Sequence, residues 1–190
     1  MTHAELPAWK KQLPMWLTWA RMALCLPMAA IMLTMSDPWG GYLAAFLFII
    51  ASITDWLDGY YARLFNAQST MGKFMDPIAD KILVSTILIL LIPSGRIGPI
   101  VVILLLARDI LIGGIRSVAA ADRVIIDAKA TGKWKTAVQM VGIPALLINT
   151  PIFGAPIAQF GSTLLWISAV LSVISGWEYI QIFRTARRGA

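Results

Sequence analysis

Hydrophobic and polar positions alternate along this chain on the scale of whole segments, with six long apolar runs separated by short polar joints. The runs cover roughly residues 15–35, 39–63, 76–93, 97–120, 134–150 and 156–183. Each is about long enough to cross the ~30 Å of a bilayer's hydrocarbon as a helix, the third only just. Because lipid offers backbone groups no partners, the pattern predicts an all-α integral membrane protein with six transmembrane helices. The joints at 36–38, 93–95 and 149–151 have turn-forming residues, and one domain is expected over residues 1–190.

Composition supports a membrane protein and narrows its chemistry. The chain has 190 residues, of which 58% are hydrophobic and 14% charged, whereas soluble domains carry about 25% charged residues. A single cysteine, Cys25, excludes an internal disulfide and a cysteine-cluster metal site. The only histidine, His3, lies in the N-terminal tail. Catalysis in the core is therefore left to carboxylates, lysines and arginines.

The net charge of +6 is distributed unevenly along the predicted topology. One side has Lys10, Lys11, Arg21, Arg63, Lys73, Lys81, Arg116, Arg123, Lys129, Lys133, Lys135, Arg184, Arg187 and Arg188, whereas the opposite loops offer Arg96. The positive-inside rule then places both termini in the cytosol, with residues 1–14 as an interfacial segment. A signal peptide is the alternative, but its apolar run would exceed the usual length of about 7–15 residues. With no soluble basic surface, a nucleic-acid partner is not expected.

Residues 55–80 place four aspartates in this apolar chain. Asp55 falls about 24 Å along its run, near the predicted cytosolic boundary, and Asp58 follows on the same helical face. Asp76-Pro77 is predicted to start the third helix, with Asp76 as its N-cap, and Asp80 lies one turn further on. The short connection predicts antiparallel neighbouring helices, so that the two carboxylate pairs converge.

Four converging carboxylates repel one another unless cations lie between them. Ligands that offer only oxygen select a hard cation: Mg²⁺, Mn²⁺ or Ca²⁺. Four carboxylates can hold one ion or two, and two ions about 3.5–4 Å apart can clamp the oxygens of a phosphoryl displacement. The alternative is a set of solvated helix-end carboxylates partnered by Arg63 and Lys81.

The spacing of these residues resembles the signature of the CDP-alcohol phosphotransferase family. The matching pattern is Asp55-x-x-Asp58-Gly59-x-x-Ala62-Arg63, eight residues, then Gly72-x-x-x-Asp76-x-x-x-Asp80. The resemblance implies a six-helix membrane domain, usually a homodimer. It also implies transfer of a phosphatidyl or similar phosphoalkyl group from a CDP-linked donor to an alcohol, with release of CMP.

The same resemblance assigns roles to single residues. One or two Mg²⁺ or Mn²⁺ ions are expected on Asp55, Asp58, Asp76 and Asp80. Asp80 is also the expected catalytic base, which takes the proton of the acceptor hydroxyl. The expected CDP-binding residues are Thr18, Asp58, Gly59, Ala62, Arg63 and Gly72. The family often has an asparagine three positions before the threonine, where this chain has Met15.

Basic residues in the second half suggest where an acceptor binds. Arg108 lies within the fourth apolar run, where a cation is costly unless it is paired or ligand-bound. Arg116 lies two turns along the same face, and Lys133 and Lys135 open the fifth run. Together they predict a basic pocket for an acceptor phosphate. Positive-inside anchoring and an internal Arg108–Asp109 pair are the alternatives.

Residues 71–81 and 132–140 resemble one branch of the family, the bacterial phosphatidylglycerophosphate synthases. The resemblance implies CDP-diacylglycerol and sn-glycerol 3-phosphate as substrates in a bacterial cytoplasmic (inner) membrane. The usual Arg-Glu of that branch is Arg108-Asp109 here, and Asp109 either orients Arg108 or binds an acceptor hydroxyl. Inositol phosphate, serine and phosphatidylglycerol are the alternative acceptors. From other classes, the alternatives are a divalent-cation transporter and a non-catalytic scaffold.

Overall fold

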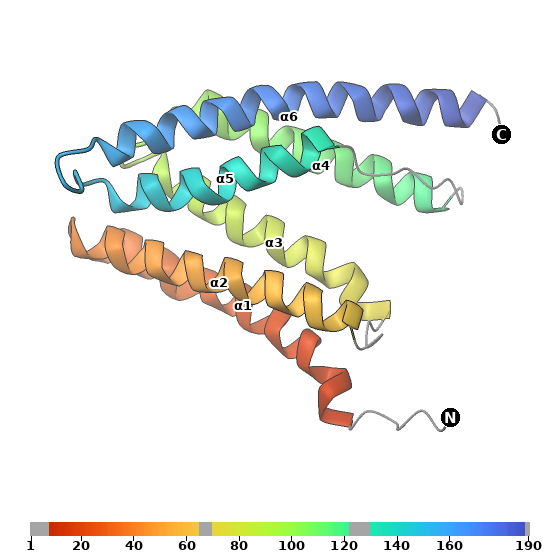
Figure 1. Cartoon of the computed structure of the whole chain (residues 1–190), viewed down its shortest axis with the longest axis horizontal. Coiled ribbons are helices and arrows are strands. Elements are labelled where there is room, and N and C mark those ends of the chain that lie inside the picture. The colour runs from red at the N-terminus through yellow and green to blue at the C-terminus, as the bar shows by residue number, and fades with distance from the viewer. Residues whose placement is uncertain (1–7, 65–69, 122–129, 189–190) are drawn as a thin grey trace. The chain divides into compact units, whose positions relative to one another are not determined.

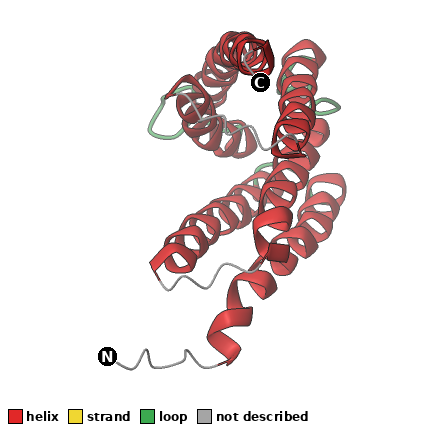
Figure 2. Ribbon diagram, turned by 90° about the vertical axis from the view of Figure 1, so that its right-hand side faces the viewer, coloured by secondary structure: helices red, strands yellow, loops and turns green. Residues whose placement is uncertain are grey.

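The computed structural model describes residues 8–64, 70–121 and 130–188. Side chains are described in these ranges except at positions 8–14, 56, 58–64, 70–74, 76–77, 120–121 and 187–188. Within the described ranges the regular structure is helical, apart from one isolated bridge between Ile152 and Ala155 (Figure 2). The prediction of an all-α protein is confirmed for this part of the chain.

Six helices follow the six predicted apolar runs (Figure 1). They are α1 (Ala8–Thr34), α2 (Trp39–Leu64), α3 (Thr70–Leu91), α4 (Pro99–Ala121), α5 (Ala130–Ile148) and α6 (Ile157–Arg188). The predicted turns at 36–38, 93–95 and 149–151 all fall between helices. Two contain residues with positive φ, Gly95 at 69° and Asn149 at 46°, a conformation that ends a helix sharply.

The start of the third helix differs from the prediction. Helix α3 begins at Thr70, so Asp76 is not its N-cap and Pro77 lies inside the helix. Proline is common at a helix start, but apolar helices also tolerate internal proline because neighbouring groups satisfy the freed carbonyl. Helix α5 likewise contains Pro144.

The outer faces of the helices are apolar. Large exposed hydrophobic side chains include Leu26 and Leu33 on α1, Trp39 on α2, Ile110 on α4 and Trp177 on α6. Water-soluble proteins rarely expose so many large apolar side chains, whereas a bilayer solvates them. By length and hydropathy, two helical stretches in the described ranges, Met15–Thr34 and Ile157–Ala186, are long and apolar enough to cross a membrane.

The chain forms two compact units, residues 1–90 and 91–190. In the first unit α1 packs against α2. The inner face of α1 is formed by Thr18, Arg21, Cys25 and Met28, which are buried at alternating spacings of three and four residues. This spacing is that of a helical stripe facing a core, and it includes one arginine.

In the second unit α6 packs against both α4 and α5. The α5–α6 contact depends on two glycines, Gly142 and Gly161. A Cβ at Gly161 would lie 2.8 Å from the backbone nitrogen of Leu146 and 2.9 Å from the carbonyl oxygen of Gly142. The two helix backbones therefore approach more closely than any side chain at Gly161 allows, as is common between membrane helices.

We expect Gly161→Ala to destabilise the protein by about 1–3 kcal/mol, because the added methyl group meets backbone atoms that cannot move aside. The measurement is thermal or denaturant unfolding in detergent micelles, followed by circular dichroism. The matched control is Gly114→Ala on α4, where an added Cβ meets nothing within 4 Å. That control should be neutral or slightly stabilising, since alanine favours helix over glycine. Equal effects of the two substitutions would contradict the close packing.

Candidate functional site

Arg21 brings two of the four predicted aspartates together in the first unit. Its Nη1 atom lies 2.5 Å from Oδ1 of Asp55 on α2 and 2.8 Å from Oδ1 of Asp80 on α3. Only 3% of the arginine side chain is exposed, against 38% for Asp55 and 40% for Asp80. A buried cation thus contacts both carboxylates, and more than a third of each aspartate side chain is exposed.

The local sequence explains why Arg21 lies there. It occupies the inner stripe of α1, one turn after Thr18 and one turn before Cys25. A guanidinium buried in an apolar helix bundle has to be paired, because its desolvation is otherwise very unfavourable. Sequence reasoning missed this role and assigned Arg21 to positive-inside anchoring. The available signal was its spacing from Thr18 on a face that is otherwise apolar.

The structure locates only part of the predicted metal and CDP site. The side chains of Asp58, Gly59, Ala62, Arg63, Gly72 and Asp76 lie outside the described residues. Thr18, the remaining predicted CDP contact, is 2% exposed. Among the described side chains, no group of three or more histidine, cysteine, aspartate or glutamate residues is arranged to hold a metal ion. The four-aspartate site therefore remains a prediction, with Asp55 and Asp80 already adjacent.

The chemistry of Asp55 and Asp80 is compatible with a divalent cation. Both supply hard oxygen donors, and both are partly exposed. A carboxylate has two oxygens with about four acceptor positions between them, so the contact from Arg21 to Oδ1 leaves capacity for a metal. These two residues fit Mg²⁺ or Mn²⁺ by donor type, and their partnership with Arg21 does not prevent coordination.

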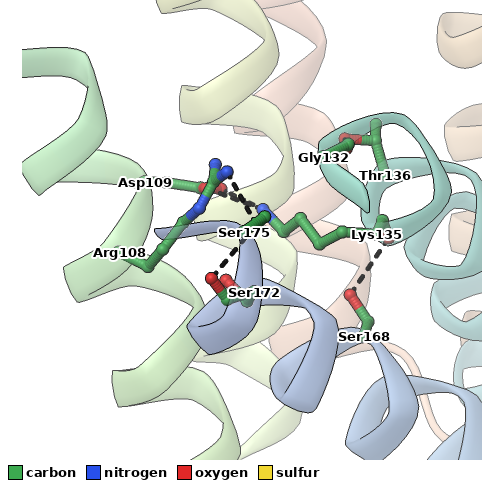
Figure 3. A network of polar contacts seen from close by, with 8 residues as sticks. All are labelled: Arg108, Asp109, Gly132, Lys135, Thr136, Ser168, Ser172 and Ser175. Carbon is green, nitrogen blue, oxygen red and sulfur yellow. Dashed lines mark hydrogen bonds and ion pairs between the residues drawn. The ribbon is translucent and has the colours of Figure 1, made fainter. Parts of the chain in front are cut away.

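A second polar network lies inside the second unit (Figure 3). Lys135 on α5 donates from Nζ to both carboxylate oxygens of Asp109 on α4, at 2.6 Å each. Arg108 donates from Nη1 to Oδ1 of Asp109 at 3.0 Å and from Nη2 to Oγ of Ser175 on α6 at 2.9 Å. One carboxylate thus joins two cations, and the network connects all three helices of the unit.

Small residues and serines make room for this network. A Cβ at Gly176 on α6 would lie 3.3 Å from Cγ of Arg108, so the arginine stem packs directly on the glycine. The Oγ of Ser168 donates to the carbonyl oxygen of Lys135 at 3.1 Å, and that of Ser175 donates to the carbonyl oxygen of Ser172 at 3.2 Å. Helix α6 therefore contributes a stripe of serines to the polar network that it forms with α4 and α5.

The four predicted acceptor residues divide into two groups. Arg108 and Lys135 meet through Asp109, which contacts both, so the internal pair weighed as an alternative is present. Lys133 is exposed on α5 and is not part of the contacts shown in Figure 3. Arg116 lies about two turns after Arg108 on α4, and its guanidinium carbon is 5.5 Å from the ring centre of Tyr179. The Arg108–Asp109–Lys135 cluster has a formal charge of +1.

On helices α4, α5 and α6, three buried polar atoms have no hydrogen-bond partner in the described structure. They are Nε of Arg108, Nε2 of Gln139 and Oγ of Ser172. One atom comes from each helix of the unit, and Gln139 lies one turn after Lys135 on α5. Buried polar groups are normally satisfied by protein or by ordered water. The unit therefore has spare hydrogen-bonding capacity for water or a polar ligand.

The signature aspartates in a helical, apolar chain define a class of membrane-embedded transferase, and comparison with known families agrees. The chain belongs to the CDP-alcohol phosphatidyltransferase family, whose sequence pattern matches residues 11–174. That range contains all four aspartates, Arg21 and the whole Arg108–Asp109–Lys135 cluster.

Three individual relatives that align with most of the chain all have the same enzyme name. The chain is 39% identical to a CDP-diacylglycerol–glycerol-3-phosphate 3-phosphatidyltransferase of Bacillus subtilis, over 88% of this chain and 92% of the relative. Proteins of the same name are 36% identical in Rickettsia bellii, over 90% and 94% of the two chains, and 34% identical in Mycoplasma genitalium, over 93% and 84%.

We expect Lys135→Met to destabilise the protein by about 1–3 kcal/mol. The substitution leaves Asp109 without its closest counter-charge, and the effect stays below that of a fully buried pair because Asp109 is partly exposed and keeps Arg108. Unfolding in detergent measures it. Lys133→Met, two residues earlier and exposed, is the control and should change stability by less than about 0.5 kcal/mol. The double variant Lys135→Met, Asp109→Asn should recover part of the loss; full additivity would argue against the pair.

Proposed function

We propose that this protein transfers the phosphatidyl group of CDP-diacylglycerol to sn-glycerol 3-phosphate. The products are phosphatidylglycerol phosphate and CMP, and the reaction belongs to phospholipid biosynthesis. The proposal rests above all on relatives named for this reaction that align over about nine-tenths of the chain. The meeting of Asp55 and Asp80 at Arg21 supports it independently, since it brings together carboxylates from two helices, α2 and α3, at an arginine of α1.

The proposed setting is a bacterial cytoplasmic membrane that all six helices cross. The termini and the active site face the cytosol, where the basic residues gather and where a water-soluble acceptor is available. A homodimer is proposed from the family resemblance. This arrangement lets a lipid-tailed donor and a soluble acceptor meet at one boundary.

Asp55, Asp58, Asp76 and Asp80 are proposed to bind one or two Mg²⁺ or Mn²⁺ ions. Such an ion, when bound, neutralises the donor diphosphate and stabilises CMP as a leaving group. The CDP moiety is bordered by Thr18, Asp58, Gly59, Ala62, Arg63 and Gly72. The glycines and the alanine leave space for close approach of the nucleotide to the backbone.

The transfer itself is a displacement at phosphorus. The acceptor hydroxyl oxygen forms a bond to the phosphorus that carries diacylglycerol, and the bond from that phosphorus to the CMP oxygen breaks. Asp80 takes the hydroxyl proton, and its 40% exposure leaves one side of the carboxylate accessible. Holding the hydroxyl in line with the leaving group supplies much of the rate enhancement.

Arg108, Arg116, Lys133 and Lys135 are proposed to bind the acceptor phosphate. The residual positive charge of the Arg108–Asp109–Lys135 cluster and the buried Nε of Arg108 are the observations that support an anion in this unit. Asp109 holds both cations and so sets where they point. Acceptors without a phosphate would make no use of this charge.

The purified protein in micelles with CDP-diacylglycerol and Mg²⁺ should release CMP when glycerol 3-phosphate is added. Inositol phosphate, serine and phosphatidylglycerol are tested separately, and CMP is measured by chromatography. Release with one of these but not with glycerol 3-phosphate would overturn the acceptor assignment. No release with any acceptor, together with Mn²⁺ flux into liposomes, would favour a cation transporter. Chelation of divalent ions should abolish release.

The same assay tests the proposed role of Asp80 as the base with the variant Asp80→Asn. It keeps the size of the side chain and can still accept a bond from Arg21, but it cannot take up a proton as a carboxylate does. We expect at least a ~100-fold loss of turnover, the lower end of the usual effect of a positioned base. Helicity and melting temperature should stay close to wild type, and normal turnover would remove Asp80 from its role.

Arg116→Ala should raise the KM for glycerol 3-phosphate about tenfold, the equivalent of ~1.4 kcal/mol, with a smaller change in kcat. The reason is the loss of a cation that contacts the acceptor phosphate and not the reacting phosphorus. Initial rates of CMP release against acceptor concentration measure it. Arg184→Ala, an exposed arginine near the end of α6, is the control and should leave KM unchanged. An unaltered KM for Arg116→Ala would exclude Arg116 from the pocket.

A further inference from the structure

The contacts of Arg21 point to a function that neither the family resemblance nor the predicted site includes. Its Nη1 bonds to one oxygen each of Asp55 and Asp80, which come from different helices and lie 25 positions apart in the chain. Both carboxylates belong to the metal site of the proposed function. A buried cation at that point either competes with a metal ion or positions its ligands.

The exposure of the three side chains distinguishes these two roles. Arg21 is enclosed, with 3% of its side chain exposed, whereas the two aspartates each expose more than a third. An ion arriving from solvent therefore meets the open side of the carboxylates, opposite the arginine. The contacts from Arg21 go to Oδ1 of each carboxylate, and a carboxylate has about four acceptor positions, so Arg21 can keep these contacts while a metal binds.

Charge balance also favours a role for Arg21 in positioning the metal ligands over competition with the metal. Four aspartates carry a formal charge of −4, and Arg21 reduces it to −3, which still attracts one or two divalent ions. Without Arg21, Asp55 and Asp80 repel each other and rotate toward solvent, so that an ion must order them as it binds. With Arg21 in place, Asp55 and Asp80 are already held together before a metal ion binds.

We propose that Arg21 is a positioning residue that ties Asp55 and Asp80 together from behind and so prepares them to bind a divalent cation. The inference rests on the metal site of the proposed function. It assigns to α1, which supplies no metal ligand, the task of setting the distance between ligands on α2 and α3. Residues behind metal ligands commonly tune affinity in this way.

The test is Mn²⁺ binding to the purified full-length protein in detergent micelles, with free Mn²⁺ measured by electron paramagnetic resonance. Arg21→Met keeps an unbranched, space-filling side chain but removes the charge and the donors. We expect its Kd for Mn²⁺ to rise about 10–100-fold, the usual effect of losing a residue that supports metal ligands. Arg21→Lys restores the charge and donors and should recover part of the affinity, which a purely structural role would not predict.

Arg96→Met is the control, because Arg96 is a partly buried arginine of the second unit that donates to the carbonyl oxygens of Leu146 and Leu147 at 3.4 and 2.9 Å. Its Kd for Mn²⁺ should equal that of wild type. If Arg21→Met loses helicity, Arg21→Gln, which keeps two donors, replaces it with the same expected direction. An unchanged or lower Kd in the Arg21 variants would overturn the inference and identify Arg21 as a neutral or competing neighbour.

The Mn²⁺ titration contains neither CDP-diacylglycerol nor an acceptor, so it separates this inference from the proposed reaction. A wild-type protein that releases CMP, with Arg21 variants that bind Mn²⁺ normally, would leave the reaction standing and remove only the role of Arg21. A wild-type protein that binds no Mn²⁺ would refute both the metal site and this inference.

Discussion

Charged side chains buried among apolar helices have to find their counter-charges on neighbouring helices of the same compact unit, and the helix contacts within each unit depend on that constraint. Arg21 satisfies it with carboxylates from two other helices, and Lys135 satisfies it with Asp109. Apolar faces alone allow neighbouring helices to slide by a turn with little change in contact. A buried ion pair removes that freedom, since a shifted register would leave a charge unpaired in a medium of low polarity.

Most of the fold was predictable from the sequence, because membrane helices are specified by long apolar runs and short turn signals. Each predicted run contains the greater part of one observed helix, and Gly95 and Asn149 mark turns through their left-handed backbone. The start of α3 was not predictable from Asp76-Pro77. In water that pair favours a helix start, whereas within an apolar bundle the proline is accommodated and the helix extends back to Thr70.

The candidate site was predictable where it depends on spacing within one helix and not where it depends on contacts between helices. The aspartates were found because positions three or four apart share a helical face. The partnership of Arg21 with Asp80 joins residues 59 positions apart, and that of Lys135 with Asp109 joins residues 26 apart. No local pattern encodes such pairs. For Arg108 the sequence left ligand binding and internal pairing open, and the structure contains the pair.

The two polar networks leave residual charges of opposite sign. Among the described side chains, Arg21 with Asp55 and Asp80 has an excess of one negative charge, and Asp109 with Arg108 and Lys135 has an excess of one positive charge. The basic partners Arg21 and Lys135 are buried, whereas the aspartates they contact are partly exposed. A cation in the first unit and an anion in the second would each offset the charge that the described side chains leave unbalanced. Charge alone would therefore direct the two proposed ligands, a metal cation and an acceptor phosphate, to different units of the chain.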